Sequence, residues 1–284
     1  MTRRVAQRQF LLRPSRILNQ LVLYCLSHAA EEFKIEVHAF CFLSNHYHIV
    51  LTDRFGTLPD FLHWMNLHIA KCTNATYGRW ESVWAPGSYS MVTLASPEDV
   101  VEKIVYTLTN PVAAGLVRFG NQWPGVRTCP RDIGSREYVT ERPQFFFTDG
   151  MPKTVRLKLV RPRGFLELRV EELAGLIDKR VAAKETEIQR KFEVESRSFV
   201  GKKRVLKPSP FDGPYTKEPR RRINPRVASK DKWRRIEALQ RLREFLEEYY
   251  VALKKFCAGV RDVAFPKGTY WMQRHYGVCC TGPP

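Results

Sequence analysis

Two histidines stand two positions apart in this chain, inside a run of apolar residues. His46 and His48 flank Tyr47 within the stretch 40–51. In a β-strand, alternate side chains point to the same face of the sheet, so the two imidazoles would project side by side. Neutral imidazole is a common ligand of divalent metals, and a packed core gains little from two of them. The spacing therefore indicates a metal site.

A tyrosine and an asparagine lie one helical turn apart further along the chain. Tyr106 and Asn110 fall in a segment predicted to be helical, so their side chains share a face. Pro111 disfavours helical backbone at Asn110, and we expect the helix to end there. The amide oxygen could join the imidazoles around a cation that keeps open positions for substrate oxygens. The phenol could then attack a metal-bound phosphodiester and form a phosphotyrosine that retains the bond energy.

The elements that must position these groups alternate between strand and helix over the first 120 residues. We expect strands at 9–12, 35–43, 47–52 and 88–94. Helices are expected after Ser15, over 58–77, and from Ser96 to about residue 108, with the two serines as N-caps. The order βαββαβα predicts an α+β fold, a ferredoxin-like or RRM-like antiparallel sheet with helices.

The second half of the chain has a different pattern. Residues 126–163 and 201–228 are predicted to be irregular linkers, and helices are expected over 170–192 and 231–257. The apolar stripe of the last helix, which includes Trp233, is predicted to be core. A strand-like tail is expected over 263–272. We therefore predict a catalytic domain at 1–125 and a basic, mostly helical extension at 126–284.

The net charge of +18 is concentrated in the second half. Residues 1–150 hold 15 Lys and Arg against 13 Asp and Glu, whereas residues 151–284 hold 32 against 16. Such an excess points to a polyanionic partner, most simply nucleic acid, although few basic residues stand near the two motifs in the sequence. The predicted nucleic-acid-binding residues are Lys202, Lys203, Arg204, Arg220, Arg221, Arg222, Arg234 and Arg235.

Composition excludes several other classes of protein. No apolar run approaches the roughly 20 residues needed to cross a bilayer, and the basic N-terminus is not followed by an apolar signal core. The seven cysteines show no CxxC pair, which favours a reducing compartment over a disulfide framework. We therefore predict a cytoplasmic protein without a membrane partner.

The two motifs together resemble those of a known family. Residues 45–48, Asn-His-Tyr-His, resemble the HUH motif (His, hydrophobic residue, His). Residues 106–117 resemble the segment from tyrosine to Asn-Pro-Val-x-x-Gly in REP-associated tyrosine transposases, relatives of the single-tyrosine transposases of small insertion sequences. The resemblance covers about residues 1–125. Compact members of the family stop soon after this segment, whereas this chain continues for about 160 residues.

The resemblance implies a ferredoxin-like HUH endonuclease that acts on single-stranded DNA with Mg²⁺ or Mn²⁺ and takes part in DNA recombination and transposition. By this resemblance, His46, His48 and Asn110 are the metal ligands. Tyr106 is the nucleophile, which leaves a 5′-phosphotyrosine and a free 3′-hydroxyl. The expected substrate is a hairpin or palindromic element, which the basic second half of the chain is expected to grip.

Two alternatives stay open at this point. The chain could be a domesticated, non-catalytic regulator that binds DNA or RNA, or an unrelated hydrolase that activates water with a metal. The sequence does not decide between a monomer that cuts in cis and a homodimer that exchanges its tyrosine helix. It also leaves open whether Trp80, Trp84 and Tyr89 stack on bases or anchor loops, and His38, His63 and His68 lack the support that the paired histidines have.

Overall fold

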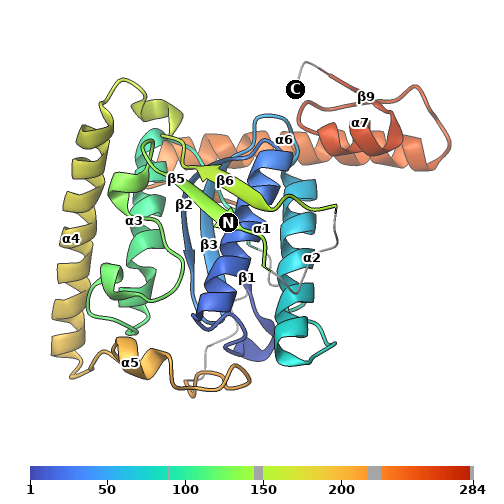
Figure 1. Cartoon of the computed structure of the whole chain (residues 1–284). Coiled ribbons are helices and arrows are strands. Elements are labelled where there is room, and N and C mark those ends of the chain that lie inside the picture. Colours follow the sequence, from blue (N-terminus) through green and yellow to red (C-terminus); the bar gives the residue numbers. More distant parts are fainter. Residues whose placement is uncertain (88–89, 144–149, 217–224, 282–284) are drawn as a thin grey trace.

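A three-stranded antiparallel sheet lies at the centre of the protein (Figure 1). The computed structural model describes residues 1–87, 90–143, 150–216 and 225–281. Strands β1 (Thr2–Arg4), β3 (His46–Thr52) and β2 (Glu36–Phe42) lie in that order, each antiparallel to its neighbour. Helix α1 (Arg16–Glu32) connects β1 to β2. These elements form a split β-α-β unit, with β3 between two parallel strands.

The first strand was expected at 9–12, and this prediction is wrong because the strand is β1, at residues 2–4. A 3₁₀ turn at Ala6–Arg8 follows β1, with Gln7 at φ 51° inside it. The neighbouring residues Leu11 and Leu12 are both buried, an arrangement that the alternation of a strand does not give. Residues 9–12 therefore form a turn that packs onto the core.

A fourth strand was expected at 88–94, and in the described residues it is reduced to β4 (Thr93–Leu94). Residues 88 and 89 lie outside the described residues. Ser90 exchanges two backbone hydrogen bonds with Thr2, of 2.8 and 3.0 Å, so it lies antiparallel beside β1. The chain thus passes along the edge of β1, where the described residues form isolated bridges, Ser90 with Thr2 and Trp84 with Val5, and not a continuous strand.

Helices cover both faces of the sheet. Helix α2 (Leu58–Tyr77) lies beside α1 on one face, and α3 (Pro97–Ala113) crosses β2 and β3 on the other (Figure 1). The predicted N-caps are confirmed, since Ser15 Oγ accepts from Leu18 N and Ser96 Oγ from Asp99 N. These local contacts fix where α1 and the tyrosine-bearing helix α3 begin.

Helix α3 does not end at Asn110, as Pro111 had suggested. Pro111 lies inside the helix, which continues to Ala113. Ala114 N donates to Asn110 O, and Gly115 at φ 71° then reverses the chain. A proline removes one hydrogen-bond donor, and the packing of α3 against the sheet compensates for that loss. Asn110 is therefore held in regular helix and not at a free end.

The segment 126–163 was expected to be irregular, and this prediction is also wrong in part. It holds the hairpin of β5 (Glu137–Glu141) and β6 (Thr154–Lys158), which lies over α1 (Figure 1). Thr128 N and Val160 N donate to backbone carbonyls of β2 and so cover the edge of that strand. The aromatic clump at residues 145–147 lies outside the described residues. The core of the first half thus continues past residue 125.

The second half is mostly helical, as expected. Helix α4 (Val170–Val194) runs beside α3, and the short α5 (Lys202–Val205) follows it (Figure 1). Strand β7 (Val227–Ala228) pairs in parallel with β4, which joins the second half to the start of α3. The remaining elements are α6 (Lys232–Cys257), β8 (Ala264–Phe265), α7 (Tyr270–Tyr276) and β9 (Cys279–Cys280). Short 3₁₀ helices lie at Gly120–Gln122, Pro130–Asp132 and Arg163–Phe165.

The apolar stripe of α6 is not core, contrary to expectation. The side chain of Trp233 is 75% exposed and that of Leu239 44%, and Ala252 is the one residue of α6 that is fully buried. The C-terminal half of α6 packs on β8 and α7 through a small apolar cluster. An amphipathic pattern predicts an apolar face but does not specify what covers it.

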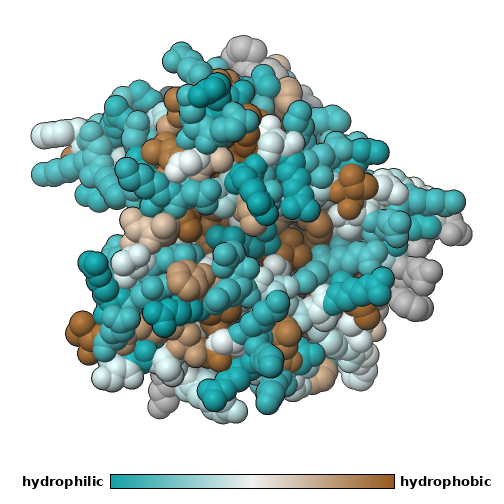
Figure 2. All heavy atoms as spheres, turned by 60° about the vertical axis from the view of Figure 1, so that its left-hand side comes forward, coloured by the Kyte–Doolittle hydropathy of each residue, from teal (hydrophilic) through white to brown (hydrophobic). Residues whose placement is uncertain are grey.

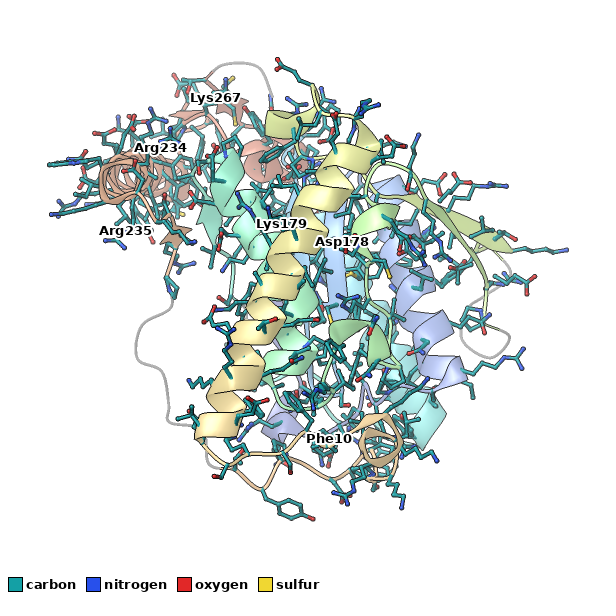
Figure 3. All side chains as sticks on the ribbon, turned by 90° about the vertical axis from the view of Figure 1, so that its left-hand side faces the viewer. Phe10, Asp178, Lys179, Arg234, Arg235 and Lys267 are labelled. Carbon is teal, nitrogen blue, oxygen red and sulfur yellow. The ribbon has the colours of Figure 1, made fainter. Side chains whose placement is uncertain are left out.

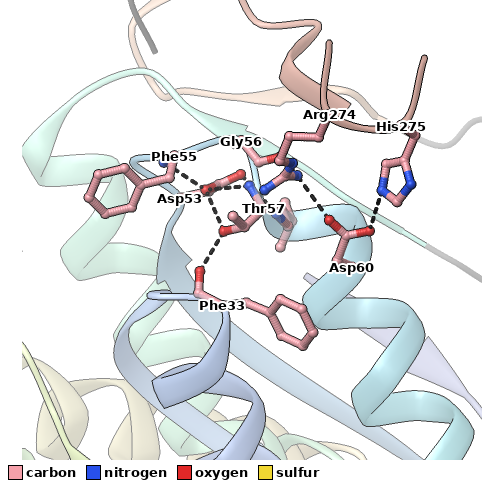
Figure 4. Close-up of polar contacts among 9 residues, drawn as sticks. Phe33, Asp53, Phe55, Gly56, Thr57, Asp60, Arg274 and His275 are labelled. Carbon is pink, nitrogen blue, oxygen red and sulfur yellow. Dashed lines mark hydrogen bonds and ion pairs between the residues drawn. The ribbon is translucent and has the colours of Figure 1, made fainter. Parts of the chain in front are cut away.

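Helix α7 docks on the turn between β3 and α2 and on the start of α2 (Figure 4). Arg274 pairs with Asp60 at 2.9 Å and donates to Gly56 O at 2.6 Å, and His275 Nε2 lies 3.2 Å from the same carboxylate. Asp53 accepts from the backbone of Thr57 in this turn. Polar contacts thus hold α7 against the first half. No helix in the described ranges has the length and apolarity that a membrane span requires.

Candidate metal and tyrosine site

The two histidines lie side by side on one face of β3, as their spacing predicted. The ring centroids of His46 and His48 are 5.0 Å apart, and their planes are nearly perpendicular. Tyr47, between them, points to the opposite face, where its hydroxyl donates to Asn66 Oδ1 of α2 at 2.7 Å. The period of the strand therefore separates an apolar face under α1 and α2 from a histidine face under α3.

The imidazole of His48 is held as a metal-binding histidine would be. It is buried, and its Nδ1 lies 2.6 Å from the hydroxyl of Thr2 on β1. Its Nε2 is also buried and has no hydrogen-bond partner within the described part of the chain. Burial lowers the pKa of His48 well below its ordinary value, and the positive charges of His46, the N-terminal amine, Lys103 and Arg4 lower it further. The ring is therefore neutral, and in the tautomer with the proton on Nδ1 the lone pair of the buried Nε2 is available for a cation.

His46 is oriented by its neighbour in sequence. Its Nδ1 lies 2.7 Å from Asn45 Oδ1, and Asn45 Nδ2 in turn donates to the backbone oxygen of Arg8. An amide oxygen only accepts, so Nδ1 of His46 carries the proton and its lone pair is on Nε2. Both histidines thus have Nδ1 engaged by an oxygen, as metal-ligating histidines usually have; at His46 it is an amide oxygen, which only accepts, and at His48 a hydroxyl, which can accept or donate.

Tyr106 faces these histidines from α3. The centroids of the His48 and Tyr106 rings are 5.3 Å apart, and Tyr106 is 46% exposed. Lys103 lies one turn earlier on the helix, with its Nζ 4.9 Å from the centroid of the tyrosine ring. Burial lowers the pKa of Lys103, and the charge of Asp99 opposes this shift. The structure therefore brings a phenol, an ammonium group and a pair of imidazoles together from two elements.

Asn110 lies on α3 one turn beyond Tyr106 and is buried. The described residues contain no cluster of three His, Cys, Asp or Glu side chains that could hold a metal. A cation bound by the two histidines would therefore need other donors, and the amide oxygen of Asn110 stays the predicted one. The Nε2 of His48, which has no partner in the described residues, and the imidazole pair fit a divalent metal, and oxygen donors would have to complete the shell of Mg²⁺ or Mn²⁺, because both favour oxygen ligands.

The site opens into a cleft of about 1100 Å³. Both His48 and Tyr106 line it, together with four basic side chains, Arg4, Arg8, Lys103 and Arg163. The sequence had suggested few basic residues around the site, and the structure corrects this. Lys103 could have been found from its position three residues before Tyr106, which places both on one side of the helix. The contact of Thr2 with His48 spans 46 positions, and no local pattern points to it.

The predicted nucleic-acid-binding residues lie in different places. Tyr106 borders a second hollow besides the cleft just described. The exposed side chains of α5, namely Lys202, Lys203 and Arg204, line neither of these two hollows. The side chain of Arg234 pairs with Glu98 at the start of α3, at 3.8 Å. Arg235 lines the second hollow. Figure 3 shows Arg234 and Arg235 at the start of α6, across from α4. Arg220, Arg221 and Arg222 lie outside the described residues.

The remaining candidates have structural contacts or stay exposed. His38 is buried with both ring nitrogens engaged, by Val160 O and Thr52 Oγ1. Trp84 is buried and donates to a backbone oxygen, which fits a loop anchor, whereas Trp80 is 89% exposed. Tyr89 lies outside the described residues.

Comparisons with known proteins give little beyond this geometry. No protein-family model matches the chain, and no curated protein matches it. A solved structure of a REP-associated tyrosine transposase bound to a REP hairpin is similar over 46% of this chain and 75% of its own. The identity is 21% and the TM-score 0.35.

Proposed function

We propose that this chain is a metal-dependent, site-specific single-stranded DNA endonuclease and strand-transferase, a transposase of the HUH type with Tyr106 as its nucleophile. One observation carries the proposal: the buried Nε2 of His48 has no partner among the described residues, on a ring that lies against Tyr106. A neutral ligand and an exposed phenol thus share one cleft. The two motifs, both within residues 1–125, support the same function, with a ferredoxin-like catalytic domain whose core continues past residue 125 through the hairpin of β5 and β6, followed by a basic, mostly helical extension.

His46 and His48 would hold the metal, with Asn110 as the proposed third ligand. Bound Mg²⁺ or Mn²⁺ would polarise the phosphodiester and neutralise the charge that develops on its oxygens. The amide oxygen of Asn45 keeps the proton of His46 on Nδ1 and leaves the lone pair on Nε2, and the hydroxyl of Thr2 can accept from Nδ1 of His48 in the same tautomer. The chain would therefore present a preorganised pair of ligands and would not need to rearrange them.

The proposed chemistry is phosphoryl transfer to and from Tyr106. The phenol oxygen forms a bond to phosphorus as the bond from phosphorus to the 3′-oxygen breaks. The phenol proton passes to solvent, which reaches the half-exposed ring, and the departing 3′-oxygen takes up a proton. The product is a 5′-phosphotyrosine with a free 3′-hydroxyl. One phosphoester replaces another, so rejoining requires no ATP.

Lys103 has a supporting role in this proposal. Its ammonium group lies over the tyrosine ring, where it can stabilise the phenolate and the incoming phosphate. Arg4 and Arg8 line the same cleft and add positive charge along it. The cleft is thus suited to a polyanion, and single-stranded DNA that forms a hairpin is the partner we propose.

The test is the covalent adduct. The protein is incubated with Mn²⁺ and labelled single-stranded hairpins from its own genomic flanks, then run on a denaturing gel. We expect a protein–DNA band for the wild type, no band for Tyr106→Phe, and a normal band for Tyr250→Phe, a matched change at an exposed tyrosine of α6.

Other outcomes favour the alternatives. If the protein is instead a metal-dependent hydrolase that activates water, its Tyr106→Phe variant would still cleave DNA. A non-catalytic regulator would bind the hairpins without forming a band in any variant.

A further inference from the structure

A second hollow borders Tyr106 on the side away from the histidine cleft. Its volume is about 740 Å³, and it lies between α3, α4 and the segment that joins β7 to α6. Tyr106 and Lys103 line both hollows, so the nucleophile stands where the two meet. Figure 2 turns the left-hand side of Figure 1 toward the viewer. On this face, apolar residues are recessed between hydrophilic ones.

The lining of this second groove has two kinds of residue. Small or β-branched apolar side chains lie on α3, α4 and β7, namely Val105, Ala183, Val227 and Ala228. Basic side chains accompany them, namely Arg180, Lys184, Lys230 and Arg235. A nucleotide presents the same pair of surfaces, an apolar base face and an anionic phosphate. The groove is thus chemically matched to a single strand of nucleic acid.

Acidic residues in the groove do not prevent this use. Glu102 pairs with Lys230 at 3.0 Å and with Arg180 at 3.6 Å, and Glu187 pairs with Lys184 at 2.7 Å. The third acid of the lining, Asp99, accepts from the hydroxyl of Ser96 and from the backbone of Lys230. The side chains of the ion pairs are about 40% exposed or more, and exposed ion pairs contribute only about 0–1 kcal/mol each. A phosphate can therefore compete for the cations.

Arg235 is the cation best placed to bind a phosphate. It is exposed, and its guanidinium forms no ion pair with any residue that the structure describes. It comes from α6, while the apolar lining comes from α3, α4 and β7. The second half of the chain therefore forms one wall of the groove, and the first half supplies the tyrosine.

We infer that single-stranded DNA runs through both hollows, with one flank of the cleaved bond in the histidine cleft and the other in the groove under Arg235. This rests on the proposed function. An internal phosphodiester has nucleotides on both sides, so an endonuclease must accommodate both flanks around its nucleophile. The position of Tyr106 between two hollows meets that requirement. In this arrangement the basic extension has a specific role, because its residues in the groove hold the DNA strand on the far side of the scissile phosphate.

The test measures binding without cleavage. All variants carry Tyr106→Phe, and the dissociation constant of a fluorescent single-stranded oligonucleotide is measured from 50 to 200 mM salt. Each phosphate contact on a single strand contributes about −0.7 to the slope of log K against log salt. We therefore expect Arg235→Ala to reduce the steepness by about 0.7, which makes the loss of affinity over this range about 2.5-fold smaller.

The matched control is Arg243→Ala. Arg243 lies two turns along the same helix, 82% exposed, and pairs with Glu247 outside the groove. We expect the slope of log K against log salt for Arg243→Ala to equal that of the parent. For Lys184→Ala combined with Arg235→Ala, we expect the slope to be less steep by about 1.4. Equal slopes for Arg235→Ala and the parent, or equal losses at Arg235 and Arg243, would overturn the inference and leave the proposed function intact. A parent that fails to bind single-stranded DNA would instead remove the proposed function.

Discussion

Replacing Thr2 by valine should weaken metal binding without touching a ligand. The hydroxyl of Thr2 lies 2.6 Å from Nδ1 of His48, and in the metal-binding tautomer it accepts a hydrogen bond from that nitrogen. Valine has nearly the same shape but no acceptor, so the ring would be free to change its tautomer and its orientation. The Nδ1 proton would also be left in a partly buried place without a partner.

The size of the effect can be worked out from this contact. Loss of a partner that orients a metal-ligating histidine typically weakens metal affinity about 10- to 100-fold. At a Mn²⁺ concentration 100 times the wild-type dissociation constant, the metal stabilises the wild type by about 2.7 kcal/mol. The same concentration should stabilise Thr2→Val by only about 1.4 kcal/mol for a tenfold loss, and about 0.4 kcal/mol for a hundredfold loss.

The assay is urea unfolding with and without Mn²⁺, and the fold provides a matched control. Thr52 makes the same kind of contact, from its hydroxyl to Nε2 of His38 at 2.9 Å, but Nδ1 of that ring is bound to Val160 O. Thr52→Val should lower stability by about 1–3 kcal/mol, because a buried nitrogen loses its partner. Its response to Mn²⁺ should match the wild type. A full Mn²⁺ response in Thr2→Val, or the same loss in both variants, would refute the assignment of His48 as a ligand.

Two further predictions concern the face opposite the site and the start of α3. Tyr47→Phe should reduce the free energy of unfolding by about 1–3 kcal/mol, because buried Asn66 Oδ1 loses its donor. The stabilisation by Mn²⁺ should stay unchanged. A smaller stabilisation by Mn²⁺ would contradict the placement of Tyr47 and the histidines on opposite faces of β3. Burial acts to raise the pKa of Asp99, but hydrogen bonds from Ser229 and Ser96 bring it below its ordinary value of 3.8. The carboxylate thus adds stability above that value, which is lost as pH falls through the folded pKa. Asp99→Asn should flatten this acid limb in urea unfolding measured as a function of pH, and a limb parallel to the wild type would count against it.

The features that the sequence predicted correctly are those set within one element. The alternation of a strand placed His46 and His48 on one face, and the serine caps fixed the starts of α1 and α3. Each depends on residues fewer than five positions apart. The stripe of α6 shows the limit of such patterns: the periodicity of the helix was right, but Trp233 is exposed because nothing in a periodicity specifies a partner surface.

The hairpin of β5 and β6 was not predicted, for a related reason. Residues 154–158 alternate polar and apolar side chains, with Val155 and Leu157 buried, which is a strand signal. The Pro- and Gly-rich flanks concealed it. Pro111 led to the opposite error, a helix predicted to end too early. The local preference at Asn110 against helical backbone was overridden by packing along the whole of α3. Local preference is weak compared with burial, and these segments are where the two disagree.

The charge around the nucleophile depends on contacts that no local pattern encodes. Thr2 reaches His48 across 46 positions, and Arg235 lines the same groove as Tyr106 although 129 positions separate them in the chain. The sequence could therefore indicate a tyrosine and a metal pair, each within its own element, but not the route that a polymer takes past them. That route arises where β7 pairs with β4 and brings the basic half of the chain to the start of α3. The chain beyond residue 125 also completes the core under the site, because Ile133, Leu157 and Leu173 are buried in the same apolar cluster as Leu108 of α3. These later residues therefore support the tyrosine helix as well as line the groove beside it.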